Sequence, residues 1–225
     1  ETIRTESGEV FELARHMRRA ANAARKFEIK LPSEDQIRVA IVALLAEEPH
    51  QLGRLRLLFS KGWFVAVHQS YVEILEPAKL TVIDESRLID PIAFKTFPYS
   101  HRTGLLQLAQ RDGFDEIICV NELGEITEGA VSNFLFRIDG KWITTPLSAG
   151  VLPGVQRAIV IERCGVTVQS LTRNDMELVE SAIVISSLKI GLAVASIDNR
   201  ELVIDAQCLS LIEKIRAQTH SHSVG

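Results

Sequence analysis

Several features that would indicate other classes of protein are scarce or missing in this 225-residue sequence. It has only three cysteines, Cys119, Cys164 and Cys208, with no Cys-x-x-Cys spacing, so neither a disulfide framework nor a metal site is indicated. A formal net charge of -4 leaves no basic surplus for binding nucleic acid. Apolar stretches such as residues 37–45 and 182–188 are shorter than the roughly 20 residues that cross a bilayer, and no signal-peptide pattern is visible. We therefore expect a cytoplasmic protein with no membrane or nucleic-acid partner.

The sequence does contain enough apolar residues, 46% of the total, to bury a large core or two small ones. We expect a small α+β domain over residues 1–84, a polar linker at 85–93 and a second domain over 94–225. The chain begins at Glu1, directly in strand-like sequence, so we also expect material upstream of it.

Hydrophobic periodicity and turn residues predict the elements of each domain. In the first domain, strands are expected at 1–5, 55–59, 63–68 and 71–75, and helices at 13–26 and after a capping box formed by Ser33 and Gln36. In the second, helices are expected at 101–111, 153–164 and 206–218, and strands at 116–120, 132–138, 141–145, 166–171, 182–186, 193–197 and 201–204. The strands at 132–138 and 141–145 are expected to form a hairpin through Asp139-Gly140. The many strands of the second domain predict a barrel-like or sandwiched architecture.

Lys95 is a candidate nucleophile because it lies between Phe94 and Thr96 in a segment that is otherwise poor in charge. Burying a lysine on an apolar strand lowers its pKa and favours the neutral amine that attacks a carbonyl. A lysine on an edge strand can instead extend its stem to solvent. Spacing alone leaves both interpretations open.

Two further charged residues could bind a cofactor. Glu128 lies in a glycine-bounded turn, where a carboxylate could pair with a protonated heteroaromatic nitrogen or could simply be solvated. Arg19 belongs to a basic cluster on the first predicted helix, which could bind a phosphate or form an exposed helix face.

Uncharged groups could also bind a phosphate. Val155 and Gln156 begin a helix after Pro153 and Gly154, so their backbone N–H groups and the helix dipole favour an anion. Ser186 and Ser187, at the end of a predicted strand, could add hydroxyl and backbone donors. Each of these features is common in proteins of every kind.

Taken together, however, several short segments follow one another in a fixed order along nearly the whole chain. They are Glu1-Thr2-Ile3-Arg4, His16-x-x-Arg19, Phe94-Lys95-Thr96, Asn121-Glu122-x-Gly124-x-Ile126-Thr127-Glu128-Gly129, Ser132-Asn133-Phe134-x-Phe136, Thr145-Pro146 and Gly150-Val151-Leu152-Pro153-Gly154-Val155-x-Arg157. In this order they resemble the class IV aminotransferase family of pyridoxal 5′-phosphate enzymes, also called fold type IV. The run from Lys95 to Arg157 is the most specific part.

The resemblance implies a two-domain subunit of mixed α+β class. Such enzymes have a small α+β domain and a larger pseudo-barrel α/β domain, with the cofactor in the cleft between them, and usually form homodimers. By position in the matching segments, Lys95 would form the Schiff base with the cofactor and later move the substrate proton. Glu128 would pair with the pyridinium nitrogen. The groups that would bind the phosphate are Arg19, Val155, Gln156, Ser186 and Ser187. Tyr99 is a candidate to lie near the ring.

The resemblance leaves the reaction open between two kinds of enzyme and one binding protein. The short chain favours 4-amino-4-deoxychorismate lyase, which releases pyruvate and forms 4-aminobenzoate for folate biosynthesis. A transaminase of branched-chain or other amino acids is the alternative. The sequence shows no Arg-x-His strand pattern of the D-amino-acid enzymes. A non-catalytic protein that binds the cofactor is the third interpretation, against which the presence of both Lys95 and Glu128 argues.

Overall fold

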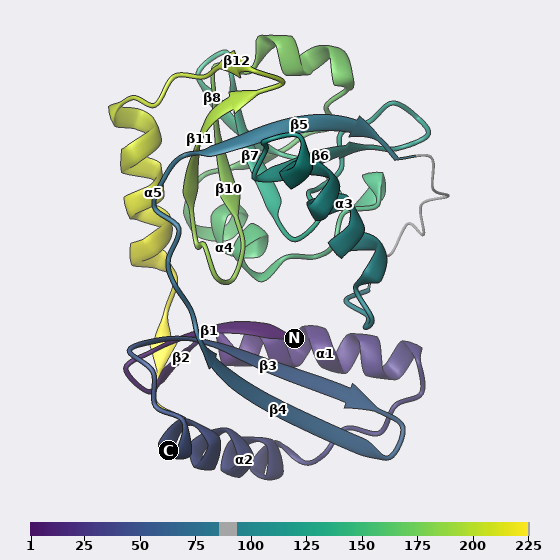
Figure 1. Ribbon diagram of the computed structural model, residues 1–225, viewed down its shortest axis with the longest axis vertical. Helices are drawn as coiled ribbons and strands as arrows, with labels where there is room; N and C mark the ends of the chain where they lie inside the picture. The colour runs from purple at the N-terminus through teal and green to yellow at the C-terminus, as the bar shows by residue number, and fades with distance from the viewer. Residues whose placement is uncertain (86–93, 225) are drawn as a thin grey trace. The chain divides into compact units, whose positions relative to one another are not determined.

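The computed structural model describes residues 1–85 and 94–224, which belong to two compact units (Figure 1). The first unit comprises Glu1–Glu73 and the C-terminal residues from Thr219, and the second comprises Ile74–Gln218. This division differs from the expected boundaries of 1–84 and 94–225. Strand β5 (Ala78–Asp84) pairs with strands of the second unit, whereas the end of the chain pairs with the first. The linker expected at 85–93 lies, apart from Glu85, outside the described residues.

The sheet of the first unit contains five strands, in the order β13-β2-β1-β3-β4, and every neighbouring pair is antiparallel. Its strands are β1 (Thr2–Glu6), β2 (Glu9–Phe11), β3 (Leu52–Ser60), β4 (Trp63–Ser70) and β13 (Ser221–His222), and its helices are α1 (Leu13–Lys26) and α2 (Glu34–Glu47). Side chains of the sheet form a core with Ile37 and Ile41 of α2. The predicted capping box is confirmed, because Ser33 Oγ accepts from Gln36 N and Gln36 Oε1 accepts from Ser33 N.

The second unit is built on a larger sheet with the strand order β6-β5-β11-β10-β7-β8-β9, which curls into a half-barrel. Its strands are β5, β6 (Glu116–Val120), β7 (Asn133–Ile138), β8 (Lys141–Thr144), β9 (Thr167–Val168), β10 (Ser181–Ile185), β11 (Leu192–Ile197) and β12 (Arg200–Glu201), which pairs with β11. Strand β5 is parallel to β6 and β11, and β8 is parallel to β9. The sheet is therefore mixed, as α+β folds often are.

Helices α3 (Ser100–Arg111), α4 (Val155–Arg163) and α5 (Ala206–Gln218) complete this unit, with two short 3-10 helices at Leu147–Ala149 and Arg173–Leu178. Alternating residues of the central strands, among them Phe134, Phe136 and Val184, are buried in its core. The predicted β7–β8 hairpin is confirmed, with positive φ angles of 47° at Asp139 and 70° at Gly140. The three cysteines are free and buried.

Several predictions of secondary structure differ from the observed elements. Residues 71–75 form no strand, because β-propensity without a partner strand does not make a ladder. Val72 in this segment is 84% exposed. The strand expected at 166–171 is reduced to β9, and Lys95 lies in irregular structure rather than on a strand. Strand β5 was missed although its alternating buried and exposed residues are typical of a strand.

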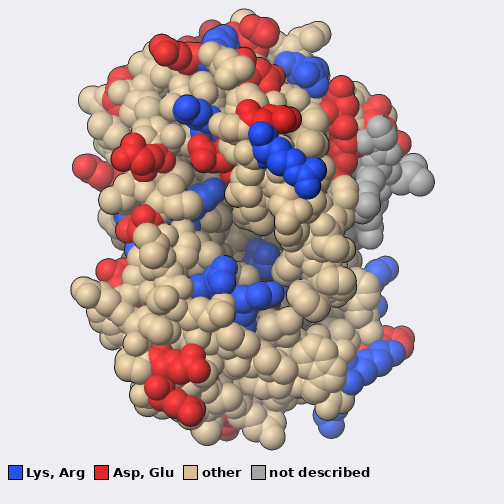
Figure 2. Space-filling model, viewed as in Figure 1, with Lys and Arg blue, Asp and Glu red and all other residues tan. Residues whose placement is uncertain are grey.

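The charge of the surface and the length of the helices relate to the expected lack of nucleic-acid and membrane partners. Acidic and basic side chains both occur on each unit in the face that Figure 2 shows. Over the described ranges 1–85 and 94–224, no helix has both the length and the apolar character needed to cross a bilayer.

Candidate functional site

Glu128 lies in the turn between β6 and β7 and is only 4% exposed, so the solvated alternative for this residue is wrong. The backbone fixes its position, since its carbonyl oxygen accepts from Cys119 N of β6 at 3.0 Å. One carboxylate oxygen, Oε1, accepts from Arg102 Nη2. A carboxylate held in this way can pair with a further positive group that enters the unit.

The other carboxylate oxygen of Glu128 has two neutral donors. Oε2 accepts from Asn133 Nδ2 and from the backbone N of Leu152, each at 3.0 Å. Burial, the largest influence, raises the pKa of Glu128, while Arg102, Leu152 and the nearby charge of Lys95 oppose that rise without cancelling it. The positive charge of Lys95 is the smallest of these influences on the pKa of Glu128.

Lys95 precedes α3 and is half-buried. Its Nζ lies 4.9 Å from the centroid of the Tyr99 ring, a cation–π distance. Tyr99 is the N-cap residue of α3, and its carbonyl oxygen accepts from Thr103 N. Lys95, Tyr99 and Glu128 all belong to the second unit. That they form a site of amine chemistry stays a prediction.

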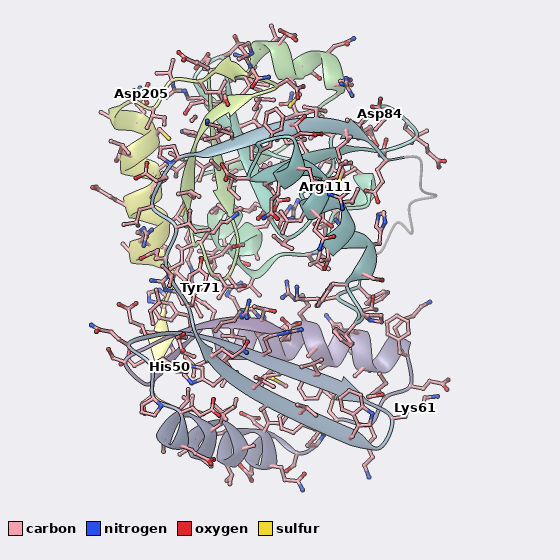
Figure 3. The ribbon with its side chains drawn as sticks, viewed as in Figure 1. His50, Lys61, Tyr71, Asp84, Arg111 and Asp205 are labelled. Carbon is pink, nitrogen blue, oxygen red and sulfur yellow. The ribbon has the colours of Figure 1, made fainter. Side chains whose placement is uncertain are left out.

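Arg102, on the first turn of α3, is a residue that the sequence did not identify. Its Nη1 donates to Gly129 O at 2.8 Å while Nη2 donates to Glu128. Figure 3 shows α3, with the label at Arg111, where the helix ends. In the sequence, an arginine near the start of a predicted helix cannot be distinguished from an arginine on an exposed helix face.

Gly154 is the N-cap residue of α4 and allows a close approach to Asn133. An added Cβ at Gly154 would lie 2.0 Å from Asn133 Oδ1, so no other residue fits without a shift. Val155 and Gln156 follow in the first turn of α4, and both are buried. The start of a helix carries partial positive charge and backbone N–H donors, which suit a phosphate.

Arg157 ties α4 to the strands that surround the site. Its Nε and Nη2 donate to Thr145 O at 3.1 and 2.7 Å, and Thr145 Oγ1 donates to Thr127 O at 2.7 Å. Burial lowers the pKa of Arg157, and the charge of Glu128 opposes this. Arg157 belonged to a matching segment but had no predicted role; the contacts make it a support for the residues around Glu128.

Glu116 is a second buried carboxylate that sequence reasoning missed. It begins β6 and is fully buried, and its oxygens accept from Ile117 N, Ala130 N, Val131 N and Ser132 Oγ at 2.9–3.3 Å. These donors fix the loop that follows Glu128. A charged residue at the start of the apolar run Ile117-Ile118-Cys119-Val120 was the signal that could have identified it.

Ser186 and Ser187 follow β10, whose last residue, Ile185, pairs with Asn133 of β7. The serines therefore come at the strand end that carries Asn133. Ser186 Oγ accepts from Lys189 N at 3.1 Å and so stabilises the turn after the strand. Their placement suits the predicted phosphate contact.

Arg19 belongs to the first unit, on α1, and not to the unit that contains Lys95 and Glu128. Its Nε and Nη2 donate to the two carboxylate oxygens of Glu1 at 3.1 and 2.5 Å. This fork fixes the guanidinium within its own unit. Its predicted phosphate contact stays a prediction.

Comparison with known proteins gives the same picture at the level of the family. The family model described as amino-transferase class IV matches residues 1–197. A Schizosaccharomyces pombe protein provisionally named aminodeoxychorismate lyase is 26% identical over 165 residues, which are 69% of each chain.

Solved structures share the fold. A Legionella pneumophila protein provisionally described as 4-amino-4-deoxychorismate lyase superposes with a TM-score of 0.88 at 22% identity, covering 97% of this chain and 90% of that one. For a hypothetical aminotransferase from Mycobacterium tuberculosis, in a form with pyridoxal phosphate bound, the TM-score is 0.85 at 19% identity, with coverage of 97% and 87%. For the branched-chain aminotransferase of Escherichia coli it is 0.81 at 19% identity, with coverage of 96% and 84%.

Proposed function

Because the chain belongs to the class IV aminotransferase family, we propose that it binds pyridoxal phosphate and acts on a primary amine as 4-amino-4-deoxychorismate lyase. The observation that carries this proposal is the buried carboxylate of Glu128, held in the same unit as Lys95 and within range of its charge. A buried carboxylate with charged neighbours is suited to pair with a pyridinium nitrogen and to keep it protonated.

The residues present fit each polar part of the cofactor. Glu128 fits the ring nitrogen, the uncapped start of α4 fits the phosphate, and the amine of Lys95 fits the aldehyde. The absence of a side chain at Gly154 keeps Asn133 and the start of α4 close together. We further propose that Ser186, Ser187 and, from the first unit, Arg19 contact the phosphate, and that Tyr99 lies beside the ring.

When bound, pyridoxal phosphate supplies an aldehyde that condenses with amines and a ring that accepts an electron pair. Lys95 would hold the cofactor through its Nζ, and a neutral Lys95 amine would take the proton from the substrate carbon that bears nitrogen. Glu128, when ionised, would hold the ring nitrogen in its protonated form.

For the lyase reaction, the carbon–oxygen bond to the enolpyruvyl group then breaks, and the electron pair of the removed proton completes an aromatic ring. The products are 4-aminobenzoate and, after a proton is added to the leaving group, pyruvate. No second substrate or redox partner is needed. A transaminase instead passes the amino group to a keto acid.

The choice of the lyase rests on the names of two relatives, the S. pombe protein and the L. pneumophila structure. A transaminase is the alternative, because other structures of the same fold are named as aminotransferases. A non-catalytic protein that binds pyridoxal phosphate is the second alternative.

The test supplies 4-amino-4-deoxychorismate to the purified protein in the absence of any keto acid and, separately, L-leucine with 2-oxoglutarate. We expect equal amounts of pyruvate and 4-aminobenzoate from the first mixture and no glutamate from the second. Glutamate formation without pyruvate release would instead establish the transaminase. A Lys95→Ala variant should lose both the cofactor absorbance of a lysine adduct and turnover, and full activity in that variant would overturn the proposal.

We also propose that the protein acts as a cytoplasmic homodimer. This part of the proposal rests on the usual state of the family. Sedimentation equilibrium of the purified protein should give twice the mass of the 25.0 kDa chain, and a single-chain mass at micromolar concentration would contradict it.

A further inference from the structure

Arg102 contacts the turn that carries Glu128 at two points at once. One nitrogen of its guanidinium donates to the carboxylate of Glu128 and another donates to the carbonyl oxygen of the next residue, Gly129, at 2.8 Å. A planar fork with two fixed bonds determines both the position and the orientation of the carboxylate. The three residues lie in one unit.

The charges around Glu128 come from several elements. The described cations that act on it are Arg102 of α3, Lys95 before α3, and Arg157 of α4. Glu85 after β5 adds a negative charge that acts on Arg102, whereas burial raises the pKa of the Cys119 thiol of β6 and keeps it neutral. Glu85 in turn bonds to His101 Nε2. Arg157 is committed to the carbonyl oxygen of Thr145. Arg102 donates directly to the carboxylate of Glu128.

The proposed chemistry separates the roles of Lys95 and Arg102. Lys95 favours an ionised Glu128 only while its amine is protonated, and the proposed function requires that amine to be neutral or bonded to the cofactor. Asn133 and Leu152 donate hydrogen bonds but bring no charge. Arg102, which stays protonated at any working pH, is then the lasting positive partner.

We propose that Arg102 is a positioning residue that keeps the Glu128 carboxylate ionised and oriented toward the ring nitrogen of the bound cofactor. This inference rests on the proposed function, because it assigns Glu128 to that nitrogen. In this role Arg102 acts through the carboxylate of Glu128, to which it donates a hydrogen bond.

The test uses the whole chain in four forms: wild type, Arg102→Met, Arg102→Lys and Arg111→Met. Methionine removes the charge and the fork, lysine keeps the charge but loses the fork, and Arg111 is an exposed arginine at the end of the same helix. The first readout is infrared titration of the Glu128 acid group in the cofactor-free protein, with Glu128→Gln identifying its band. The second is the dissociation constant for pyridoxal phosphate.

In Arg102→Met we expect the midpoint of the Glu128 titration to move to higher pH by about one unit or more, and pyridoxal phosphate to bind about 10- to 100-fold more weakly. In Arg102→Lys the midpoint should stay closer to wild type, with an intermediate loss of affinity. Arg111→Met should match wild type in both. Equal midpoints and affinities in wild type and Arg102→Met would overturn the inference.

Two outcomes separate this inference from the proposed function. If wild type itself binds no pyridoxal phosphate, the proposed function fails, and the infrared midpoints still decide whether Arg102 controls the charge of Glu128. If wild type binds the cofactor through Lys95 but Arg102→Met changes neither the titration midpoint of Glu128 nor the affinity for pyridoxal phosphate, only the role of Arg102 fails. Should Arg102→Met not fold, as judged by circular dichroism, Arg102→Lys still distinguishes the cases, because wild-type affinity in that variant would contradict a role for the fork.

Discussion

Gly154 lies so close to Asn133 that the Asn133 side chain fits only because Gly154 has no side chain. A Cβ added at Gly154 would lie 2.0 Å from Asn133 Oδ1 and 3.2 Å from its Cγ. Asn133 in turn donates to Glu128 at 3.0 Å. The start of α4 and the buried carboxylate are therefore linked through one amide.

Gly154→Ala should displace Asn133 and weaken its hold on Glu128. We expect a loss of about 1–3 kcal/mol in the free energy of unfolding, which is typical of overpacking, and weaker binding of pyridoxal phosphate. Urea unfolding and cofactor titration measure the two effects. The backbone of Gly154, with φ of −65°, suits any residue, so the clash alone is tested.

Gly104→Ala is the matched control for that substitution. Gly104 lies within α3, and an added Cβ there would meet nothing within 4 Å. Alanine should stabilise this helix by up to about 1 kcal/mol and leave cofactor binding unchanged. A Gly154→Ala variant as stable as Gly104→Ala would contradict the close approach.

Glu116→Gln should destabilise the loop after Glu128. Four donors converge on the Glu116 carboxylate, and an amide presents an N–H₂ group to some of them, which leaves buried donors without acceptors. Each unsatisfied buried group costs about 1–3 kcal/mol. Thermal unfolding checks the loss of stability.

Asp115→Asn serves as its control, because Asp115 is the exposed neighbour of Glu116 and its oxygen accepts a single bond from Lys79 N. The amide oxygen of asparagine can keep that bond. We expect a change within about 0.5 kcal/mol. Equal losses in the two variants would show that the buried carboxylate has no special role.

Gly53→Ala tests a close contact in the first unit. An added Cβ would lie 2.2 Å from His68 Nε2 and 2.4 Å from Thr5 Oγ1, which are themselves hydrogen-bonded at 2.7 Å. We expect a loss of about 1–3 kcal/mol from overpacking, measured by urea unfolding. In Gly53→Ala/His68→Ala the clash with His68 is relieved although the clash with Thr5 remains, so the double loss should be smaller than the sum of the single losses. Additive losses would exclude the contact.

The sequence was sufficient to predict most elements that have local signals. The capping box at Ser33 and the hairpin at Asp139-Gly140 were identified because short-range chemistry determines them. The short strand β13 was missed because its partner β2 lies near the other end of the chain. The division of the chain between Glu73 and Ile74 differs from the predicted boundary near residue 84 for a similar reason, since β5 pairs with strands that follow it.

The site divides along similar lines. Lys95 and Glu128 were found through an ordered set of segments, and the structure places them in one unit. Arg102 and Glu116 could not be assigned, because their importance comes from tertiary contacts with Glu128, Gly129 and the loop beyond them. A helix arginine and a strand glutamate are ordinary residues in a sequence. Only their burial and bonds distinguish them.

The stability of the cofactor-free protein should depend on pH through Glu128. Burial raises the pKa of this carboxyl above its ordinary value of 4.5. Between 4.5 and the raised pKa, the folded protein binds more protons than the unfolded chain, so stability falls as pH rises and levels off above the folded pKa. The slope is at most about 1.4 kcal/mol per pH unit for one group.

Glu1 also makes stability depend on pH, because His16 and Arg19 lower its pKa against the opposing effect of burial. The measurement is therefore the difference in unfolding free energy between wild type and Glu128→Gln, taken by urea unfolding at several pH values. We expect wild type to lose stability relative to Glu128→Gln as pH rises above 4.5. Glu122→Gln, which alters an exposed glutamate, should parallel wild type throughout. Saturating pyridoxal phosphate should oppose the decline, because an ionised Glu128 then gains the ring nitrogen as a partner. A relative stability that rises with pH in the cofactor-free protein would mean that Arg102 and Lys95 outweigh burial at this carboxylate.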